Sequence, residues 1–152
     1  MIEILRTAPA ISARKAERML TDGIVWLDTF RLDTQFKKQI LDWLRLDQLK
    51  KEGIDEDDEV IGFYSFSTSM FDSEKAFNTH YTLDDTGEFY RSLFITALID
   101  SFVITGDTAK MEDQEWWRDE ILGLNERNME KLRDGYKERL IIYAERVLFN
   151  NL

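Results

Sequence analysis

The stretch Leu83-Asp84-Asp85-Thr86-Gly87-Glu88-Phe89-Tyr90-Arg91-Ser92 organises the middle of the chain. Its Asp-Thr-Gly group is typical of a tight turn, because glycine adopts a positive φ without strain and aspartate can form an Asx turn with the backbone. An aromatic run follows directly and continues to Leu98, which predicts that the turn opens a strand. We therefore expect Gly87 to form the turn, and Arg91 and Ser92 to project from the base of a β-hairpin.

Alternation of side chains predicts the rest of that hairpin, which we expect to span Phe89–Thr105 with its return strand at Phe102–Thr105. Upstream, Val60–Phe66 is rich in β-branched and aromatic residues and is predicted to be a strand. Ser67–Thr82 is polar and lacks a clear period, which favours a long loop.

Helical spacing of apolar residues predicts helices before and after this β region. The first spans Ser12–Phe30, and the second spans Thr34–Lys51, with its first residue as N-cap and Gly53 as the C-terminal cap. A closing helix over Glu126–Phe149 is predicted to be capped by Asn125. The fold class we expect is α+β, with two N-terminal helices and a long C-terminal helix packed on a small antiparallel β-sheet.

The 152 residues fit a single domain over 1–152. Its predicted parts are a helical N-terminal part at 1–53, a strand and hairpin part at 54–105 with a long loop at 67–82, and a C-terminal helix at 120–150. A chain of this length can bury roughly 70% of the surface that its unfolded form exposes, so we expect one sizeable core.

The charge balance restricts the partners. The chain has 20 Lys and Arg against 30 Asp and Glu, a formal net charge of -10, and no Cys. An acidic surface disfavours nucleic-acid phosphates and anionic lipid, and disulfides and thiolate metal sites are impossible. The sequence shows neither a signal peptide nor an apolar run near the ~20 residues of a membrane span. We expect a soluble protein made in the cytoplasm, without a membrane partner.

Residues for catalysis are not grouped in the sequence. His80 is the only histidine, and no Gly-x-Ser-x-Gly nucleophile motif occurs. The acidic run Asp55–Glu59 fails the calcium-loop spacing, since Val60 and Phe66 occupy the positions that need glycine and glutamate. The 30 acids offer many carboxylate pairs, but no spacing singles one out. We therefore predict no enzyme, no catalytic residue, no metal site and no cofactor, and a solvated acidic turn at 55–59.

Trp116 and Trp117 are the most conspicuous remaining feature. Adjacent side chains point in different directions, so one ring can be core while the other faces a partner, or both can be buried. Phe63 and Tyr64 carry the same ambiguity. These four residues are our candidate interface.

Asp85 to Ser92 also resembles a signature of tailed-phage tail-completion proteins, also called head–tail joining or virion-morphogenesis proteins. In that family a Thr-Gly turn opens a strand, a serine lies about five residues after the glycine, and a β-hairpin and a Leu-Gly-Leu step come later. Gln48–Ser65 looks like a variant from phages of gut Bacteroidetes, so the resemblance covers Gln48 to the C-terminus. Ser67–Thr82 and the tryptophan pair have no place in the family pattern. The motif positions are Asp85, Thr86, Gly87, Phe89, Arg91, Ser92, Leu122, Gly123 and Leu124.

This resemblance implies a structural virion protein of a tailed bacteriophage, a tail-completion or head–tail connector ring component. Its implied partners are other copies of itself in a ring, the portal or adaptor, and the tail-tube proteins. DNA would pass nearby without sequence-specific binding, and a negative lumen would repel its phosphates. The implied location is the virion, after synthesis in the host cytoplasm.

The alternative is an acidic inhibitor or DNA-mimic protein that binds a nucleic-acid-binding partner. Charge and size favour it, but a mimic needs rows of carboxylates on one face. Acids and bases alternate on the predicted helices, for example from Glu126 to Arg133, which argues against it.

Overall fold

The computed structural model describes residues 33–97 and 102–149. It shows an α+β fold with a two-stranded antiparallel sheet, as predicted. The predicted helix Ser12–Phe30 lies outside the described residues. The elements are α4 (Thr34–Asp42), the π-helix η2 (Trp43–Glu52), α5 (Phe66–Phe71), α6 (Glu88–Ser92), β1 (Phe94–Ala97), β2 (Phe102–Thr105), the 3-10 helix η3 (Asp119–Leu122) and α7 (Glu126–Phe149).

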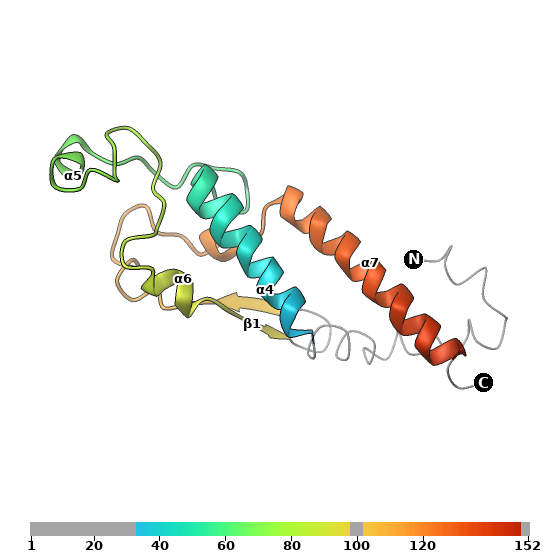
Figure 1. Ribbon diagram of the computed structural model, residues 1–152. Coiled ribbons are helices and arrows are strands. Elements are labelled where there is room, and N and C mark those ends of the chain that lie inside the picture. The colour runs from blue at the N-terminus through green and yellow to red at the C-terminus, as the bar shows by residue number, and fades with distance from the viewer. Residues whose placement is uncertain (1–32, 98–101, 150–152) are drawn as a thin grey trace.

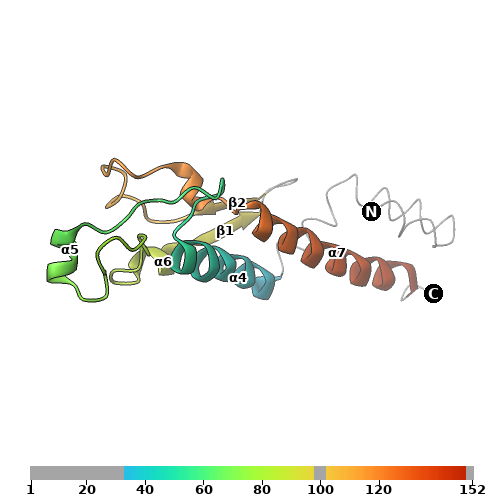
Figure 2. The same cartoon turned by 90° about the horizontal axis from the view of Figure 1, so that it is seen from above.

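The described part of the molecule is elongated. α4 and η2 form one continuous helical rod that lies against the β1–β2 hairpin, and α7 runs beside the rod (Figure 1). α5 lies at one end of the molecule, while the C-terminal half of α7 extends from the opposite end, as Figure 2 shows from above. The chain therefore presents two distant ends on either side of one core.

The core lies between the rod, the hairpin and the start of α7. In the hairpin, Ile95 pairs with Ile104 and both are buried, while Phe94 and Val103 on the opposite face are exposed. This alternation confirms the predicted hairpin from Phe94 onward. The other core residues include Phe36, Ile40, Leu44, Leu49, Leu93, Ile121, Leu124 and Leu132.

The predicted helix Thr34–Lys51 is confirmed, with a different first cap. The Asp33 carboxylate accepts the Phe36 N–H at 2.9 Å, so the N-cap is Asp33 and not Thr34. At the other end, Gly53 takes a left-handed conformation with φ 64°, as its position predicted. The second half of the rod is wound as a π-helix, a winding that apolar periodicity alone does not reveal.

α7 begins at the predicted residue. The Asn125 side-chain oxygen accepts the Asn128 N–H at 3.1 Å, which is an N-cap bond. On its charged face, Arg127 and Lys131 pair with Glu52 and Asp47 of η2. The charged face of α7 therefore joins two helices.

Two predicted strands are wrong. Phe89 to Ser92 form the short helix α6, because Gly87 (φ 73°) turns the chain directly into helical backbone and both Phe89 and Tyr90 become buried. Val60–Phe66 forms only isolated bridges, with Ile54 and with His80, and its last residue starts α5. The predicted loop 67–82 accordingly contains most of α5.

Candidate interaction surface

The segment 62–81 leaves the body of the protein, carries α5, and returns to the point where it left. At its base the Tyr81 N–H donates to the Gly62 carbonyl and the Tyr64 N–H donates to the Thr79 carbonyl, both at 2.9 Å. The Asn78 N–H donates back to the Tyr64 carbonyl at 3.0 Å. We call this segment the α5 excursion; these bonds hold its base while α5 stays at the end of the molecule (Figure 1).

Five large apolar side chains of the excursion are exposed, and we call them the apolar tip. They are Phe63, Phe66, Met70, Phe71 and Phe77. Phe71 is 91% exposed and Met70 is 70% exposed, so most of the surface of both side chains faces solvent. Phe66 and Phe77 pack edge to face, with ring centroids 5.9 Å apart. Residues 60–71 contain no charged side chain in a chain that is 33% charged.

A pocket of about 360 Å³ opens beside the excursion, between α5 and α6. Its aromatic walls come from Tyr64, Tyr81, Phe89 and Trp116, and Thr68 of α5 also lines it. The Tyr81 and Trp116 rings lie 5.3 Å apart, and the Tyr64 and Tyr81 rings lie 4.9 Å apart. Three segments that are distant in sequence thus build one apolar cavity.

The Asp-Thr-Gly turn forms one edge of this pocket. Asp85, Thr86 and Gly87 line it, and the positive φ of Gly87 allows the turn to enter α6. Arg91 folds back over the turn and donates to the Thr86 carbonyl at 3.2 Å. The turn is as predicted, but Arg91 fastens it instead of projecting from a hairpin.

Ser92 bridges α6, before the hairpin, and the segment that follows β2. Its hydroxyl donates to the Phe89 carbonyl at 2.7 Å and accepts the Asp107 N–H at 2.8 Å. The side chain is half-buried and does not line the pocket. Its role is therefore positional, consistent with the structural role expected from the sequence.

Most of the charged side chains that line the pocket form ion pairs. Lys75 bonds Asp85 at 2.6 Å and Asp72 at 3.1 Å, and Lys110 bonds Glu88 at 2.7 Å. The bond to Asp85, with help from Asp72, raises the pKa of Lys75, and the Lys110 bond lowers the pKa of Glu88. Asp107 also lines the pocket, and its carboxylate accepts the Ala109 N–H at 3.3 Å.

Asp84 is another charged side chain that lines the pocket. It pairs with Lys50 of η2 at 2.6 Å. The carboxylates of Asp84 and Asp85 therefore reach lysines, where an Asx turn was expected. The residue that bonds within the turn is Thr86, whose hydroxyl accepts the Glu88 N–H at 3.4 Å.

The four candidate interface residues occupy different environments. Phe63 is exposed, but Tyr64 is buried and its hydroxyl bonds Thr82 at 3.1 Å. Trp116 and Trp117 are both half-buried, with Trp117 packed edge to face on Phe89 at 6.4 Å. Both tryptophan rings pack against the core, and part of each stays exposed. Tyr64 forms a wall of the pocket. The place of these residues in an interface stays a prediction.

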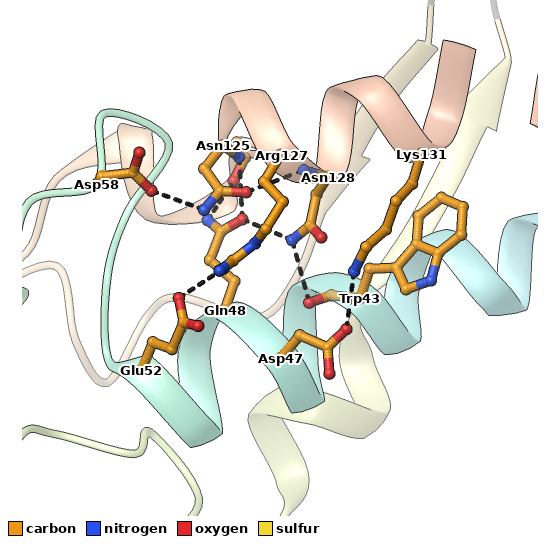
Figure 3. A network of polar contacts seen from close by, with 10 residues as sticks. Trp43, Asp47, Gln48, Glu52, Asp58, Asn125, Arg127, Asn128 and Lys131 are labelled. Carbon is orange, nitrogen blue, oxygen red and sulfur yellow. Dashed lines mark hydrogen bonds and ion pairs between the residues drawn. The ribbon is translucent and has the colours of Figure 1, made fainter. Parts of the chain in front are cut away.

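The Leu122-Gly123-Leu124 step does not line the pocket, and it leads into a polar network of Gln48, Asn125 and Asn128, which Figure 3 shows. Gln48 donates to the Gly123 carbonyl at 2.8 Å and accepts the Asn125 N–H at 2.9 Å and the Asn128 amide at 3.2 Å. Gly123 has an ordinary φ of -81°. It provides close approach, because an added Cβ would overlap the Glu56 side chain. This motif joins η2 to α7.

Asp55 corrects the expectation of a fully solvated acidic turn. Its carboxylate is buried, bonds Arg118 at 2.5 Å, and accepts the N–H groups of Asp57 and Glu59. Neighbouring Glu56 has a raised pKa because burial and the surrounding carboxylates disfavour its charge. The turn therefore has one structural acid among exposed ones.

His80 lies against the end of the helical rod. Its Nε2 bonds the Lys50 carbonyl at 3.0 Å, and its ring covers Gly53. Within residues 33–97 and 102–149, no three His, Asp or Glu side chains gather in a way that could hold a metal ion. None of the helices in those two ranges has the length and apolar character to cross a membrane.

Comparison of the chain with protein-family models, with curated proteins and with solved structures finds no match.

Proposed function

We propose that this chain is a structural protein of a tailed-phage virion, which joins the portal or adaptor to the tail as a head–tail connector or tail-completion component. The observation that carries the proposal is the apolar tip on the α5 excursion. Soluble proteins seldom expose a contiguous group of large apolar side chains unless the group contacts a partner. An assembly protein needs such a contact surface.

The place of the tip in the fold also supports a joining role. It lies at one end of an elongated molecule, while α7 extends at the other (Figure 1 and Figure 2). The base of the excursion is closed by backbone hydrogen bonds and the aromatic pocket, so the tip is presented by a defined structure. A preorganised surface loses less conformational entropy on binding than a flexible surface does.

The resemblance to the tail-completion family supports the more specific part of the proposal. Thr86, Gly87 and the hairpin occur in the order that the family has. The local structure departs from the pattern in one respect, since Gly87 opens α6 and the hairpin starts only at Phe94. The ring, with a net negative lumen that repels DNA, belongs to this part of the proposal.

Coexpression tests this proposal. The chain would be produced with the products of its neighbouring genes, purified by a tag on the chain, and imaged by negative stain. We expect portal, adaptor or tail proteins to copurify, and the double variant Met70→Ser/Phe71→Ser to lose them. Phe94→Ser, which changes an exposed apolar side chain elsewhere, is the matched control. Copurification with a nuclease or a toxin alone would reject the virion role.

The acidic-mimic alternative gains no support from the charges in the described ranges. A mimic needs unpaired carboxylates in phosphate-like rows. Many acids pair with bases instead; these include Asp33, Asp42, Asp47, Glu52, Asp55, Asp72, Asp84, Asp85 and Glu88.

A further inference from the structure

The apolar tip and the aromatic pocket are neighbours in the same chain. Thr68 of α5 faces the pocket, while Met70 and Phe71, at the end of the same helix, are exposed. In both views α5 lies at the end of the molecule, and α6 lies on the same side, nearer the helical rod (Figure 1 and Figure 2). One end of the protein therefore carries both an apolar projection and an apolar cavity.

We propose that a second copy of this chain occupies this surface, with Phe71 of each copy inserted in the aromatic pocket of the other. The inference goes beyond the proposed function, because it concerns the free protein before it meets any other component. Because the exposed Phe71 and the pocket are adjacent, a two-fold axis beside α5 would place each Phe71 at the pocket of the other copy. A two-fold contact of this kind is self-complementary, so assembly through it stops at a dimer.

The charge distribution is compatible with this contact between copies. Each chain carries a formal net charge of -10, so two copies repel over most of their surface. The stretch 60–71 carries no charged side chain, so repulsion between copies is weak at this surface. On the receiving side, five of the six charged side chains that line the pocket are in ion pairs, including Asp84, Asp85 and Glu88. The sixth, Asp107, accepts the Ala109 N–H at 3.3 Å, so an entering apolar side chain would meet few charges without an ionic partner.

The cavity has a suitable size and lining. Its volume of about 360 Å³ lies at the lower end of the range for small-molecule pockets, which leaves room for an aromatic side chain. Tyr81 and Trp116 offer ring surfaces for edge or offset contacts with an incoming phenyl group. Phe71, the most exposed apolar side chain of the tip, is the natural occupant.

Sedimentation of the full chain alone, over a range of micromolar concentrations, tests the inference. We expect a monomer–dimer equilibrium that stops at two copies, and a dissociation constant at least about tenfold weaker in Phe71→Ser. Phe94→Ser should dimerise like the parent protein. A monomer at every concentration, a species larger than two copies, or equal weakening by both variants would overturn the inference.

Cysteine crosslinking tests the geometry independently, because the chain has no cysteine of its own. Met70→Cys protein mixed with Lys110→Cys protein should form a mixed disulfide, since position 110 lines the pocket. A chain carrying both changes should close two disulfides per pair, as two-fold symmetry requires. Leu46→Cys, exposed on η2, replaces Met70→Cys in the control. Equal crosslinking by the control would overturn the inference.

These experiments use the chain alone, whereas the virion proposal is tested with its neighbours. A monomeric chain that still copurifies with portal or tail proteins would overturn only the pairing. A dimeric chain that binds no portal, adaptor or tail protein would reject only the virion role. Closed rings of the free chain would overturn the two-fold contact while supporting the proposed ring.

Discussion

Asp55 is an acidic side chain that folding removes from water. Its carboxylate is 2% exposed, while the side chain of its partner Arg118 is 30% exposed. It also accepts two backbone N–H groups of its own turn, from Asp57 and Glu59. A buried charge is tolerated only when its partners are in place. The loop that contains Trp116 and Trp117 is thereby fastened to the end of the helical rod.

Replacing Asp55 by alanine should lower the free energy of unfolding by about 2–4 kcal/mol, because Arg118 and two N–H groups lose their acceptor. Urea denaturation at neutral pH measures this change. Asp57→Ala in the same turn removes an exposed acid and should stay within about 0.5 kcal/mol. Equal losses in both variants would show that Asp55 has no special role.

Gly87 is needed for its backbone conformation. Its φ of 73° is strained for residues with a Cβ, so Gly87→Ala should lower stability by about 1–2 kcal/mol. Gly87→Asn should lose less, since asparagine tolerates this region better than alanine does. Thermal unfolding of the three proteins gives the order. An alanine variant as stable as the parent would contradict this reading.

At the level of single residues, the sequence predicted backbone roles better than buried polar ones. Gly53, Gly87 and Asn125 were identified because turns and caps demand particular residue types. The burial of Asp55 could not be predicted, because Arg118 is 63 residues away in the chain. Only the folded chain brings these two together.

At the level of elements, the junction between η2 and α7 combines a cap with a buried amide network. Asn125→Ala should lower the free energy of unfolding by about 1–2 kcal/mol, because it removes the bond to the Asn128 N–H. Asn125→Ser keeps a capping oxygen and should recover part of the loss. Urea denaturation of both variants tests this. The cap is dispensable if serine is no better than alanine.

The pair between Glu52 of η2 and Arg127 of α7 makes this junction sensitive to pH. The hydrogen bond from Arg127 holds the pKa of Glu52 below its ordinary value of 4.5. A lowered carboxylate pKa stabilises the fold above the ordinary value, and the contribution disappears as the pH falls through the folded value. Since both groups are partly exposed, the contribution is only about 0.5 kcal/mol.

Glu52→Gln should therefore be about 0.5 kcal/mol less stable than the parent at pH 7, and equally stable once the pH falls well below 4.5. Denaturation curves at several pH values measure the difference. Glu115→Gln, an exposed loop position, is the control and should show no such trend. A gap that persists in acid would exclude the ion pair as its cause.

Among the elements, periodicity over many residues was the reliable signal. The 24 residues of α7 and the hairpin from Phe94 have a clear pattern of apolar positions. α6 was misassigned because Glu88–Ser92 spans five residues, too few for periodicity to outweigh the β propensity of its aromatic residues. Val60–Phe66 has the composition of a strand, but its contact with the His80 region is limited to isolated bridges.

At the level of the whole molecule, the candidate site depends on tertiary structure. The sequence singled out the Asp-Thr-Gly turn, Tyr64 and Trp116 separately, and the fold gathers them around one pocket. Nothing in sequence spacing indicates that segments near 64, 86 and 116 meet. Of the apolar tip, only Phe63 was among the candidate interface residues. The other four residues were assigned to a strand or a loop, although the uncharged run 60–71 is visible in the sequence.

Association between whole molecules should become stronger with salt. Raising the salt concentration from about 0.1 M to about 1 M shortens the Debye length from ~10 Å to ~3 Å, which screens the repulsion between two chains of charge -10. We expect the dissociation constant of the pair to fall several-fold. Phe71→Ser provides the control for non-specific salting out. A pair that weakens with salt would indicate a contact built on ion pairs.

The network that Gln48 forms with α7 also bears on how the protein is made. Gln48 contacts residues 75, 77 and 80 positions further along, and Asp33 contacts Arg139 across 106 positions. Contacts of such long range slow folding, because the chain must close large loops before they form. While a ribosome is still adding α7, Gln48 has no partner from that helix. We therefore expect the core to close late, after α7 has left the ribosome.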